Sequence, residues 1–316
     1  MPSKEELESV LHEVISVLMN ENTEYRMYID DKTPGYILEF RDNTHVILVP
    51  DLHARNDFFV NILNTHLNGK SVISRIMDES LRVICLGDGM HAESRAKERW
   101  IQAYDEYIEG HITNDHLYQE MAESLSLMMR IMRLKIKKPS HFHFLKGNHE
   151  NILNEEGEGN HPFSKFAMEG QLVKDFMLNV YGPYTTSLYA RFEKLLPLFV
   201  IGKGFLASHA EPASFYSKKQ LIQSGLNHSI CEGLTWTANN SVSGDAVKKM
   251  LKKYQKDYPD ALYFAGHRPV KNFFEFRAGG KFVQIHNPRL SNVVYLEPGE
   301  VFNPNKNILV IGEHYV

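Results

Sequence analysis

Five short apolar runs in this chain each end in a small cluster of polar residues and glycine. The clusters are Asp51-Leu52-His53, Gly87-Asp88, Gly147-Asn148-His149-Glu150, Ser208-His209 and Gly266-His267. Short apolar runs bounded in this way are typical of buried β-strands. Loops at strand ends are where α/β proteins assemble ligand and catalytic sites, because a rigid sheet fixes side chains that lie far apart in sequence. We therefore expect an α/β fold with a functional site built from these loops.

The donor types in these clusters indicate a metal site. Asp51 and His53 lie two residues apart, so in extended backbone they can point the same way while Leu52 points to the opposite side. One divalent ion could then bind to both. Mixed Asp, Asn and His donors suit Mn, Fe or Zn better than Ca or Mg, and the scarcity of cysteine argues against a structural zinc site. A single cluster of this kind is more often a turn or a helix cap, but five in one chain favour a metal site.

The stretches around the clusters predict one α/β domain. Ser3 and Glu6 form a capping box before an apolar helical pattern, which predicts a helix over residues 4–20. A Gly-poor region from about residue 91 to residue 137 predicts one or two long helices broken near Gly110, inserted between strands at 82–86 and 141–145. No linker rich in Pro, Gly or Ser separates the halves, so residues 1–316 are expected to form a single domain.

Other elements are predicted by local patterns. Strands at 35–40 and 44–50 are expected to be joined by a tight turn at residues 41–43. Further helices are expected near 163–180, 184–195 and 243–257, and the end of the chain has the pattern of several strands. His141 and His143 alternate along a predicted strand and are interpreted as structural residues.

Composition limits the partners and the compartment. The formal net charge of −4 and a pI near 6.5 give no overall electrostatic reason to expect nucleic acid or an anionic membrane as a partner. Cys85 lies in an apolar run and is expected to be a buried free thiol, as in a reducing compartment. The charged N-terminus is not a secretory signal, and no run approaches the roughly 18 apolar residues of a membrane span, so a cytoplasmic protein is expected. The oligomeric state is not predicted.

The ordered clusters resemble those of the calcineurin-like metallophosphoesterases, whose pattern is Asp-x-His, Gly-Asp, Gly-Asn-His-Asp/Glu, His and Gly-His. The resemblance covers roughly residues 44–296, and Gly147-Asn148-His149-Glu150 is its most specific element. Within that superfamily the chain is more similar to the PPP-type phosphatases and their bacterial relatives, which include dinucleoside tetraphosphate hydrolases. That likeness rests on Leu145-Lys-Gly-Asn-His-Glu-Asn, Leu195-Leu-Pro-Leu and Gly233-Leu-Thr-Trp-Thr. It implies a two-sheet β-sandwich flanked by helices.

The resemblance also implies roles for individual residues. One metal would be held by Asp51 and His53, a second by Asn148, His209 and His267, with Asp88 bridging the pair. The implied cofactors are two divalent ions, Mn, Fe or Zn. The implied reaction is hydrolysis of a phosphate ester by metal-bound hydroxide, with Asp88 and His149 as the catalytic residues and His149 as the general acid.

The chain departs from the PPP pattern after Gly87-Asp88. PPP enzymes carry an aspartate three residues after this block, which orients the catalytic histidine, and then an arginine that binds phosphate. Here His91 and Ala92 stand at those positions. Glu93 or Glu150 are therefore the candidates to orient His149. The candidate phosphate contacts are Arg95, Arg268 and Arg55. Gly266-His267-Arg-Pro-Val also lacks the second histidine found in many other members of the superfamily.

Three functions are compatible with these motifs. The first is a phosphoesterase that acts on a phosphorylated small molecule, a nucleotide or a phosphoprotein. The alternative is a nucleotide phosphoanhydride hydrolase of the dinucleoside tetraphosphatase type. A third reading is an inactive scaffold that senses phosphate, although retention of His149 argues against it, because a binding-only site needs no general acid.

Overall fold

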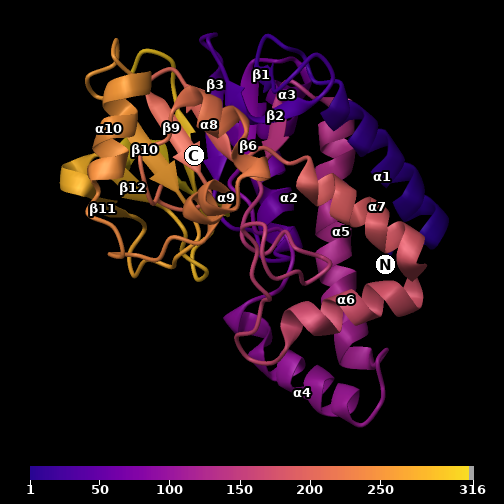
Figure 1. The fold of residues 1–316 in the computed structure, drawn as a ribbon. Helices are drawn as coiled ribbons and strands as arrows, with labels where there is room; N and C mark the ends of the chain where they lie inside the picture. Colours follow the sequence, from indigo (N-terminus) through magenta and orange to yellow (C-terminus); the bar gives the residue numbers. More distant parts are fainter. Residues whose placement is uncertain (313–316) are drawn as a thin grey trace.

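Two β-sheets packed face to face form the centre of the chain in a computed structural model, which describes residues 1–312 (Figure 1). The larger sheet has seven strands, in the order β1 (Arg26–Tyr28), β2 (Pro34–Glu39), β8 (Phe199–Gly202), β9 (Phe205–Ser208), β10 (Leu262–Ala265), β12 (Phe282–Gln284) and β11 (Glu275–Arg277). The smaller has five, in the order β14 (Ile308–Val310), β13 (Asn292–Leu296), β3 (His45–Val49), β6 (Leu81–Cys85) and β7 (Phe142–Phe144). A two-stranded hairpin, β4 (His66–Leu67) and β5 (Lys70–Ser71), lies apart from both.

Alternating side chains place apolar residues on both faces of these sheets. Along β3, Val46 and Leu48 pack between the sheets, whereas Ile47 and Val49 pack under helices. Such strands are buried on both faces, which explains why they appear in the sequence as nearly continuous apolar runs. The expected two-sheet sandwich in an α/β chain is confirmed.

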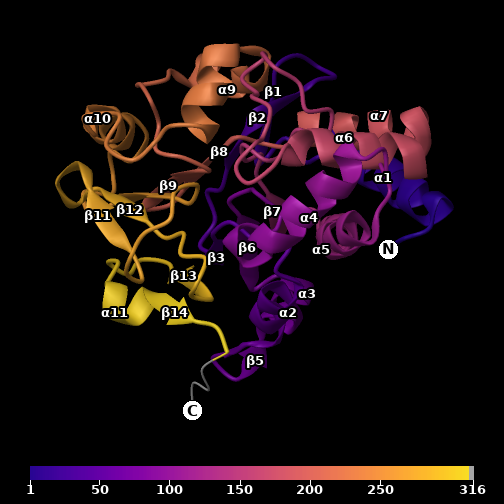
Figure 2. The same cartoon turned by 90° about the horizontal axis from the view of Figure 1, so that it is seen from below.

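Helices cover the outer face of each sheet. The five-stranded sheet is covered by α1 (Lys4–Met19), α2 (Asn56–Asn64), α3 (Val72–Met77), α4 (Lys97–Ile108), α5 (Asp115–Lys137), α6 (Glu169–Val180) and α7 (Gly182–Lys194). The seven-stranded sheet is covered by α8 (Lys218–Ile222), α9 (His228–Thr235) and α10 (Asp245–Tyr254). Figures 1 and 2 show these two groups on opposite sides of the sheets, with the short α11 (Pro304–Asn307) beside β14. No helix within residues 1–312 is both long and apolar enough to cross a bilayer.

The predicted helices are largely confirmed. Helix α1 begins where the capping box places it, with the Ser3 hydroxyl accepting the N–H of Glu6 at 3.1 Å. The region between β6 and β7 contains α4 and α5, with Gly110 in the connection, as expected. Helix α6 begins at Glu169, six residues later than the pattern indicated. Cys85 and Cys231 are buried and free.

The expected hairpin of residues 35–50 is wrong. Strand β2 pairs in parallel with β8, and β3 pairs in parallel with β6, so the two strands belong to different sheets. The Phe40 N–H still donates to the carbonyl of Ile201 at 2.8 Å, so the chain leaves the first sheet only after this residue. Because both strands are buried on both faces, each requires neighbours that a local hairpin would not supply.

Parallel pairing brings the polar clusters to one edge of the sandwich. Strands β3, β6 and β7 are parallel neighbours in one sheet, and β9, β10 and β12 are parallel neighbours in the other. The carboxyl ends of parallel strands meet at the same edge of a sheet. The loops that follow these six strands therefore face one another across the sandwich.

Candidate metal centre

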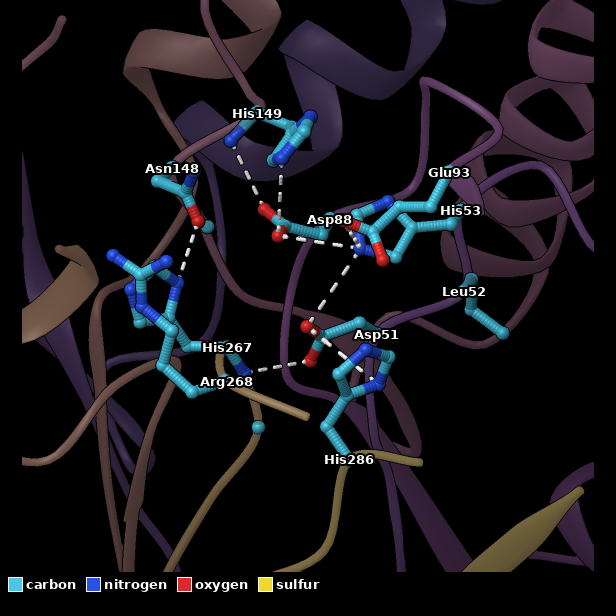
Figure 3. Close-up of polar contacts among 12 residues, drawn as sticks. Asp51, Leu52, His53, Asp88, Glu93, Asn148, His149, His267, Arg268 and His286 are labelled. Atoms are coloured by element: carbon cyan, nitrogen blue, oxygen red, sulfur yellow. Dashed lines mark hydrogen bonds and ion pairs between the residues drawn. The ribbon is translucent and has the colours of Figure 1, made fainter. Parts of the chain in front are cut away.

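Loops from both sheets bring the predicted ligands together (Figure 3). The five-stranded sheet contributes Asp51, His53, Asp88, Asn148 and His149. The seven-stranded sheet contributes His209 and His267, and all seven side chains are buried. Three groups in this cluster have ligand atoms within 4.8 Å of one another, a spacing that suits a metal ion: Asp51/His53/His286, His53/Asp88/His149 and Asp88/His209/His267.

Asp88 lies at the centre of the cluster. Its Oδ2 is 3.3 Å from Nε2 of His209 and 3.8 Å from Nε2 of both His53 and His149. Its Oδ1 accepts the backbone N–H of His149 at 3.0 Å, which fixes the carboxylate. Because His53 and His209 come from different sheets, one carboxylate oxygen faces ligands from both halves of the sandwich. The Asp88 carboxylate therefore lies between two sets of candidate ligands.

Asn148 contacts both histidines that the seven-stranded sheet contributes. Its Oδ1 lies 2.9 Å from Nε2 of His209 and 2.8 Å from Nδ1 of His267. The other ring nitrogen of His209, Nδ1, is 2.8 Å from the Leu86 carbonyl, which orients the ring by accepting its N–H. Nε2 of His209 then points a lone pair at two oxygens, of Asn148 and Asp88, unless a proton or a cation stands between them.

Electrostatics support a positive charge at this position. Burial alone would lower the pKa of His209, but the Asp88 carboxylate raises it to about 9. Burial lowers the pKa of the adjacent His267 well below its usual range, so that ring is neutral. Neutral imidazole, an amide oxygen and a carboxylate together form a donor set suited to a divalent transition metal. The residues present therefore fit a cation at this half of the cluster.

The other half of the cluster contains buried polar atoms without partners. Asp51 uses Oδ1 to accept the N–H of His267 at 2.9 Å, but its Oδ2 has no hydrogen-bond partner in residues 1–312. Both ring nitrogens of His286 are likewise buried without a partner, and Nδ1 is 3.7 Å from Oδ2 of Asp51. Buried polar atoms are rarely left unpaired. A bound cation would satisfy these atoms.

His53 completes this first group. Its Nδ1 faces the carbonyls of His91 at 3.0 Å and Met90 at 3.3 Å, so Nε2 is left to face Oδ2 of Asp51 at 3.8 Å. Burial raises the pKa of Asp51 to about 6, as expected for a carboxylate placed in a site without a compensating cation. The first half of the cluster thus also fits a metal ion.

His286 was not predicted, although the sequence contains a signal for it. The run of residues 282–285 ends at His286 in the same way that the run before His209 ends at a histidine. Its proximity to Asp51 depends on the parallel pairing of β12 with β10, which places it beside the loop that carries His267. His286 therefore joins Asp51 and His53 as a third candidate ligand.

Two glycines permit the close packing of these loops. A Cβ atom on Gly147 would lie 2.2 Å from Oδ1 of Asp88, and one on Gly266 would lie 2.0 Å from Oδ1 of Asp51. No side chain fits at such distances. Four residues of the centre that are not glycine have positive φ angles, which cost about 1–3 kcal/mol each; these are His53, Asp88, His91 and His267.

The expectation that Glu93 or Glu150 orients His149 is wrong. The Glu150 carboxylate accepts backbone N–H groups of Gly147 at 2.6 Å and of Asp88 and Gly89 at 2.9 Å. It thereby ties the loop after β7 to the loop after β6. The Glu93 carboxylate pairs instead with Lys165 at 2.7 Å.

His91 takes the place beside His149. The Nδ1 atoms of the two rings are 2.9 Å apart, and both rings are buried. His91 stacks on Phe163, whose ring also lies 3.9 Å from that of His149. Burial lowers the pKa of His91 to about 4, so the ring is neutral and can accept a hydrogen bond. The residue three positions after Asp88 thus contacts His149, but it is a histidine and not an acid.

The three candidate arginines have different surroundings. Arg55 donates from three guanidinium nitrogens to backbone carbonyls at 2.7 to 3.2 Å. Arg95 pairs with Glu123 at 2.5 Å. Arg268 is exposed, and within residues 1–312 its guanidinium has no hydrogen bond or ion pair. Figure 3 shows it beside His267. Of the three, Arg268 has the guanidinium most available to an anion.

Comparisons with known proteins bear on the fold. No protein-family model and no curated protein sequence matches this chain. A protein serine/threonine phosphatase from Saccharomyces cerevisiae, with similarity to the human phosphatase PP5, has a similar structure: the TM-score is 0.61 and the identity 13%, over 98% of this chain and 89% of that one. This likeness shows that the chain has the fold of a PPP-type phosphatase, as the resemblance implied.

Two further solved structures are less similar. One is a cold-active protein tyrosine phosphatase, with a TM-score of 0.48 and 12% identity over 82% of this chain and 75% of that one. The other is provisionally assigned as a diadenosine tetraphosphatase, with a TM-score of 0.42 and 11% identity over 88% of this chain and 97% of that one.

Proposed function

We propose that this chain is a hydrolase that uses two divalent metal ions to cleave phosphate esters. The observation that carries the proposal is the position of Asp88, whose Oδ2 faces His53 from one sheet at 3.8 Å and His209 from the other at 3.3 Å. A single carboxylate shared by two sets of ligands is the arrangement needed to hold two cations side by side. The fold it shares with a phosphatase supports the same reaction class.

The chain's residues divide into two ligand sets. Asp51, His53 and His286 would hold the first cation, with Asp88 shared, and the second set is Asn148, His209 and His267. Mn, Fe and Zn suit these nitrogen and oxygen donors. When bound, two such ions supply activation of a water molecule and neutralisation of the charge that develops on the phosphoryl group.

His149 is the proposed proton donor to the leaving oxygen. In the protonated ring, Nδ1–H donates to the neutral His91, and the Nε2–H is directed toward the side of Asp88. Burial lowers the pKa of His149 well below its usual range, although Asp88 opposes this effect. The ring is therefore neutral at rest, as His91 and His267 are, so it must take up a proton before it can donate one to the leaving alkoxide.

Arg268 is the proposed contact for the phosphoryl oxygens. It directly follows the ligand His267, it is exposed, and its guanidinium has no partner in residues 1–312. Arginine can bind two phosphate oxygens at once through its planar fork of donors. Arg55 and Arg95 are less suited to this role because other groups already accept their hydrogen bonds.

The test compares metal content and turnover in one set of proteins. Wild type and Asp88→Asn are stripped with a chelator, reloaded with Mn, and assayed on an aryl phosphate and on an aryl phosphate diester. Asp105→Asn, an exposed change on α4, serves as the matched control. Metal bound per chain is measured by mass spectrometry in parallel.

We expect Mn-dependent hydrolysis in wild type and in the control. Asp88→Asn should bind fewer than two metals and lose at least about a hundredfold in turnover, because it lacks a bridging charge and a catalytic group. Hydrolysis that persists in Asp88→Asn with full metal content would contradict the proposed centre. Two bound metals without hydrolysis of either substrate would favour the phosphate-sensing scaffold.

A further inference from the structure

A cavity of about 840 Å³ opens beside His53, next to the first ligand set. Its size is in the range of small-molecule sites, which is about 300 to 1,000 Å³. Four cations line it, Arg55, Arg95, Lys271 and Arg289. The acidic residue among its lining residues is Glu93, whose carboxylate is already paired with Lys165 at 2.7 Å. The cavity therefore presents a net positive wall to a ligand held at the metal centre.

Two of these cations are available to a ligand. Lys271 and Arg289 are exposed, and neither side chain has a hydrogen bond or an ion pair within the described part of the chain. Arg55 and Arg95, by contrast, are engaged by backbone carbonyls and by a glutamate. Clustered cations without acidic partners repel one another, so an anion between them would be favourable.

The Asn287 side chain joins the two loops that carry these cations. Asn287 donates from Nδ2 to the Asn272 carbonyl at 2.9 Å and accepts the Arg289 N–H at 2.9 Å. The loop after β10, which carries Lys271, is thereby joined to the loop after β12, which carries Arg289. The same loops carry His267 and His286. The cations are thus positioned by the elements that position the metal ligands.

A loop with three glutamates approaches the centre through His161 and Trp236. The loop of residues 155–158 contains Glu155, Glu156 and Glu158. His161 pairs there with Glu156 and Glu232, and it contacts Trp236, whose ring lies 6.4 Å from that of His267. These glutamates are largely paired, with Lys194 and with His161, whereas Lys271 and Arg289 at the cavity have no acidic partner within the described residues. A second phosphate would therefore be attracted toward the cavity.

We propose that the cavity is a second phosphate site, so that the substrates of this chain carry at least two phosphate groups. This inference rests on the proposed function and specifies its substrate class. One phosphate would react at the metal centre while the other binds Lys271 and Arg289. Water adds across one P–O bond: its oxygen bonds to the reacting phosphorus, and the leaving oxygen takes a proton. The second phosphate is joined to the first either by an anhydride chain or through two separate esters.

The experiment removes the two free cations and changes the number of phosphates. Lys271→Gln/Arg289→Gln is compared with wild type and with Lys249→Gln/Lys253→Gln, two exposed changes on α10 that alter the net charge equally. The Mn-loaded proteins are assayed on 4-nitrophenyl phosphate, on inorganic tripolyphosphate and on a sugar bisphosphate. Binding of tripolyphosphate to the metal-free proteins is measured by calorimetry.

We expect the cavity variant to hydrolyse 4-nitrophenyl phosphate as wild type does. Its KM for the substrates with two or more phosphates should rise about tenfold for each cation removed, since a charged hydrogen bond contributes about that factor. The control pair should behave as wild type. A larger rise in KM for tripolyphosphate than for the sugar bisphosphate would identify the substrate class as anhydrides. A larger rise for the sugar bisphosphate would identify it as molecules with two phosphate esters.

The failure of this inference is distinct from the failure of the proposed function. Equal KM changes for one and two phosphates, or none for either, would overturn the second phosphate site while leaving the metal centre standing. If no substrate is hydrolysed, calorimetry still decides: tripolyphosphate binding at least tenfold weaker in the cavity variant supports the site, and unchanged binding refutes it.

Discussion

Replacing His286 by leucine distinguishes a metal ligand from a structural histidine. The His286 ring is fully buried, and neither of its nitrogens has a hydrogen-bond partner within residues 1–312. An unpaired buried polar group costs about 1–3 kcal/mol. Leucine has a similar volume and no polar atom, so the metal-free variant should be as stable as wild type, or up to about 3 kcal/mol more stable.

When metal is added, His286→Leu should become less stable than wild type. A Mn concentration of 100 times the Kd stabilises wild type by about 2.7 kcal/mol. Loss of groups that only support metal ligands weakens metal binding about 10- to 100-fold, so loss of a ligand should cost at least about 100-fold. At the same Mn concentration the variant would then gain only about 0.4 kcal/mol.

Urea unfolding with and without Mn measures both effects, and His143→Leu is the matched control. His143 is also buried, but its ring nitrogens have partners: Lys135 Nζ at 3.2 Å and the Ser140 carbonyl at 3.1 Å. The free energy of unfolding of His143→Leu should be about 1–3 kcal/mol lower than that of wild type, both with and without Mn. If His286→Leu behaves in the same way as this control, His286 is a structural residue and the first ligand set is wrong.

Three other outcomes follow from single contacts. Burial raises the pKa of Glu193 to about 8, so its stabilisation is fully present below pH 4.5 and lost as pH rises to about 8; urea unfolding of Glu193→Gln should show less of this decline. His91→Phe keeps the stacking on Phe163 but removes the 2.9 Å contact with His149, so kcat should fall at least about tenfold with metal content unchanged. Gly266→Ala places a Cβ 2.0 Å from the Asp51 carboxylate, so bound Mn should fall together with activity.

Local signals predicted the helices better than the strand pairing. Helix α1 is specified by its own cap and its own apolar face, both of which lie within residues 3–19. Strand β2 has a local antiparallel partner in β1, but its other neighbour in the sheet is the distant β8, with Ile37 opposite Phe199. A turn at residues 41–43 is compatible with a hairpin and with a crossing between sheets. Only burial of both faces, which depends on distant residues, excludes the hairpin.

In the candidate site, too, local motifs were predicted and contacts between distant residues were not. The residues expected to bind metal lie together because each follows its own strand within a short motif. His286 lacks a motif, and its position depends on the pairing of β12 with β10. The surroundings of Arg55 and Arg268 could not be inferred either. The Arg55 guanidinium donates to the Leu290 carbonyl on a distant loop as well as to two nearby carbonyls, and the Arg268 guanidinium has no partner within residues 1–312. The sequence therefore identified most of the candidate metal ligands and arginines, whereas the contacts that each side chain makes depend on the tertiary structure.

The buried charges of the metal centre link metal binding to the stability of the fold. Asp51, Asp88 and Glu150 bring three buried carboxyl groups into adjoining loops. Burial raises the pKa of Asp51 to about 6, and burial with Asp88 raises that of Glu150, so the ionised forms are costly there. His209, whose pKa Asp88 raises to about 9 against the effect of burial, offsets only part of this charge. Two divalent cations would favour the ionised carboxylates. Metal binding would then stabilise the folded chain. Substitutions of the ligands should therefore destabilise the chain mainly when metal is present.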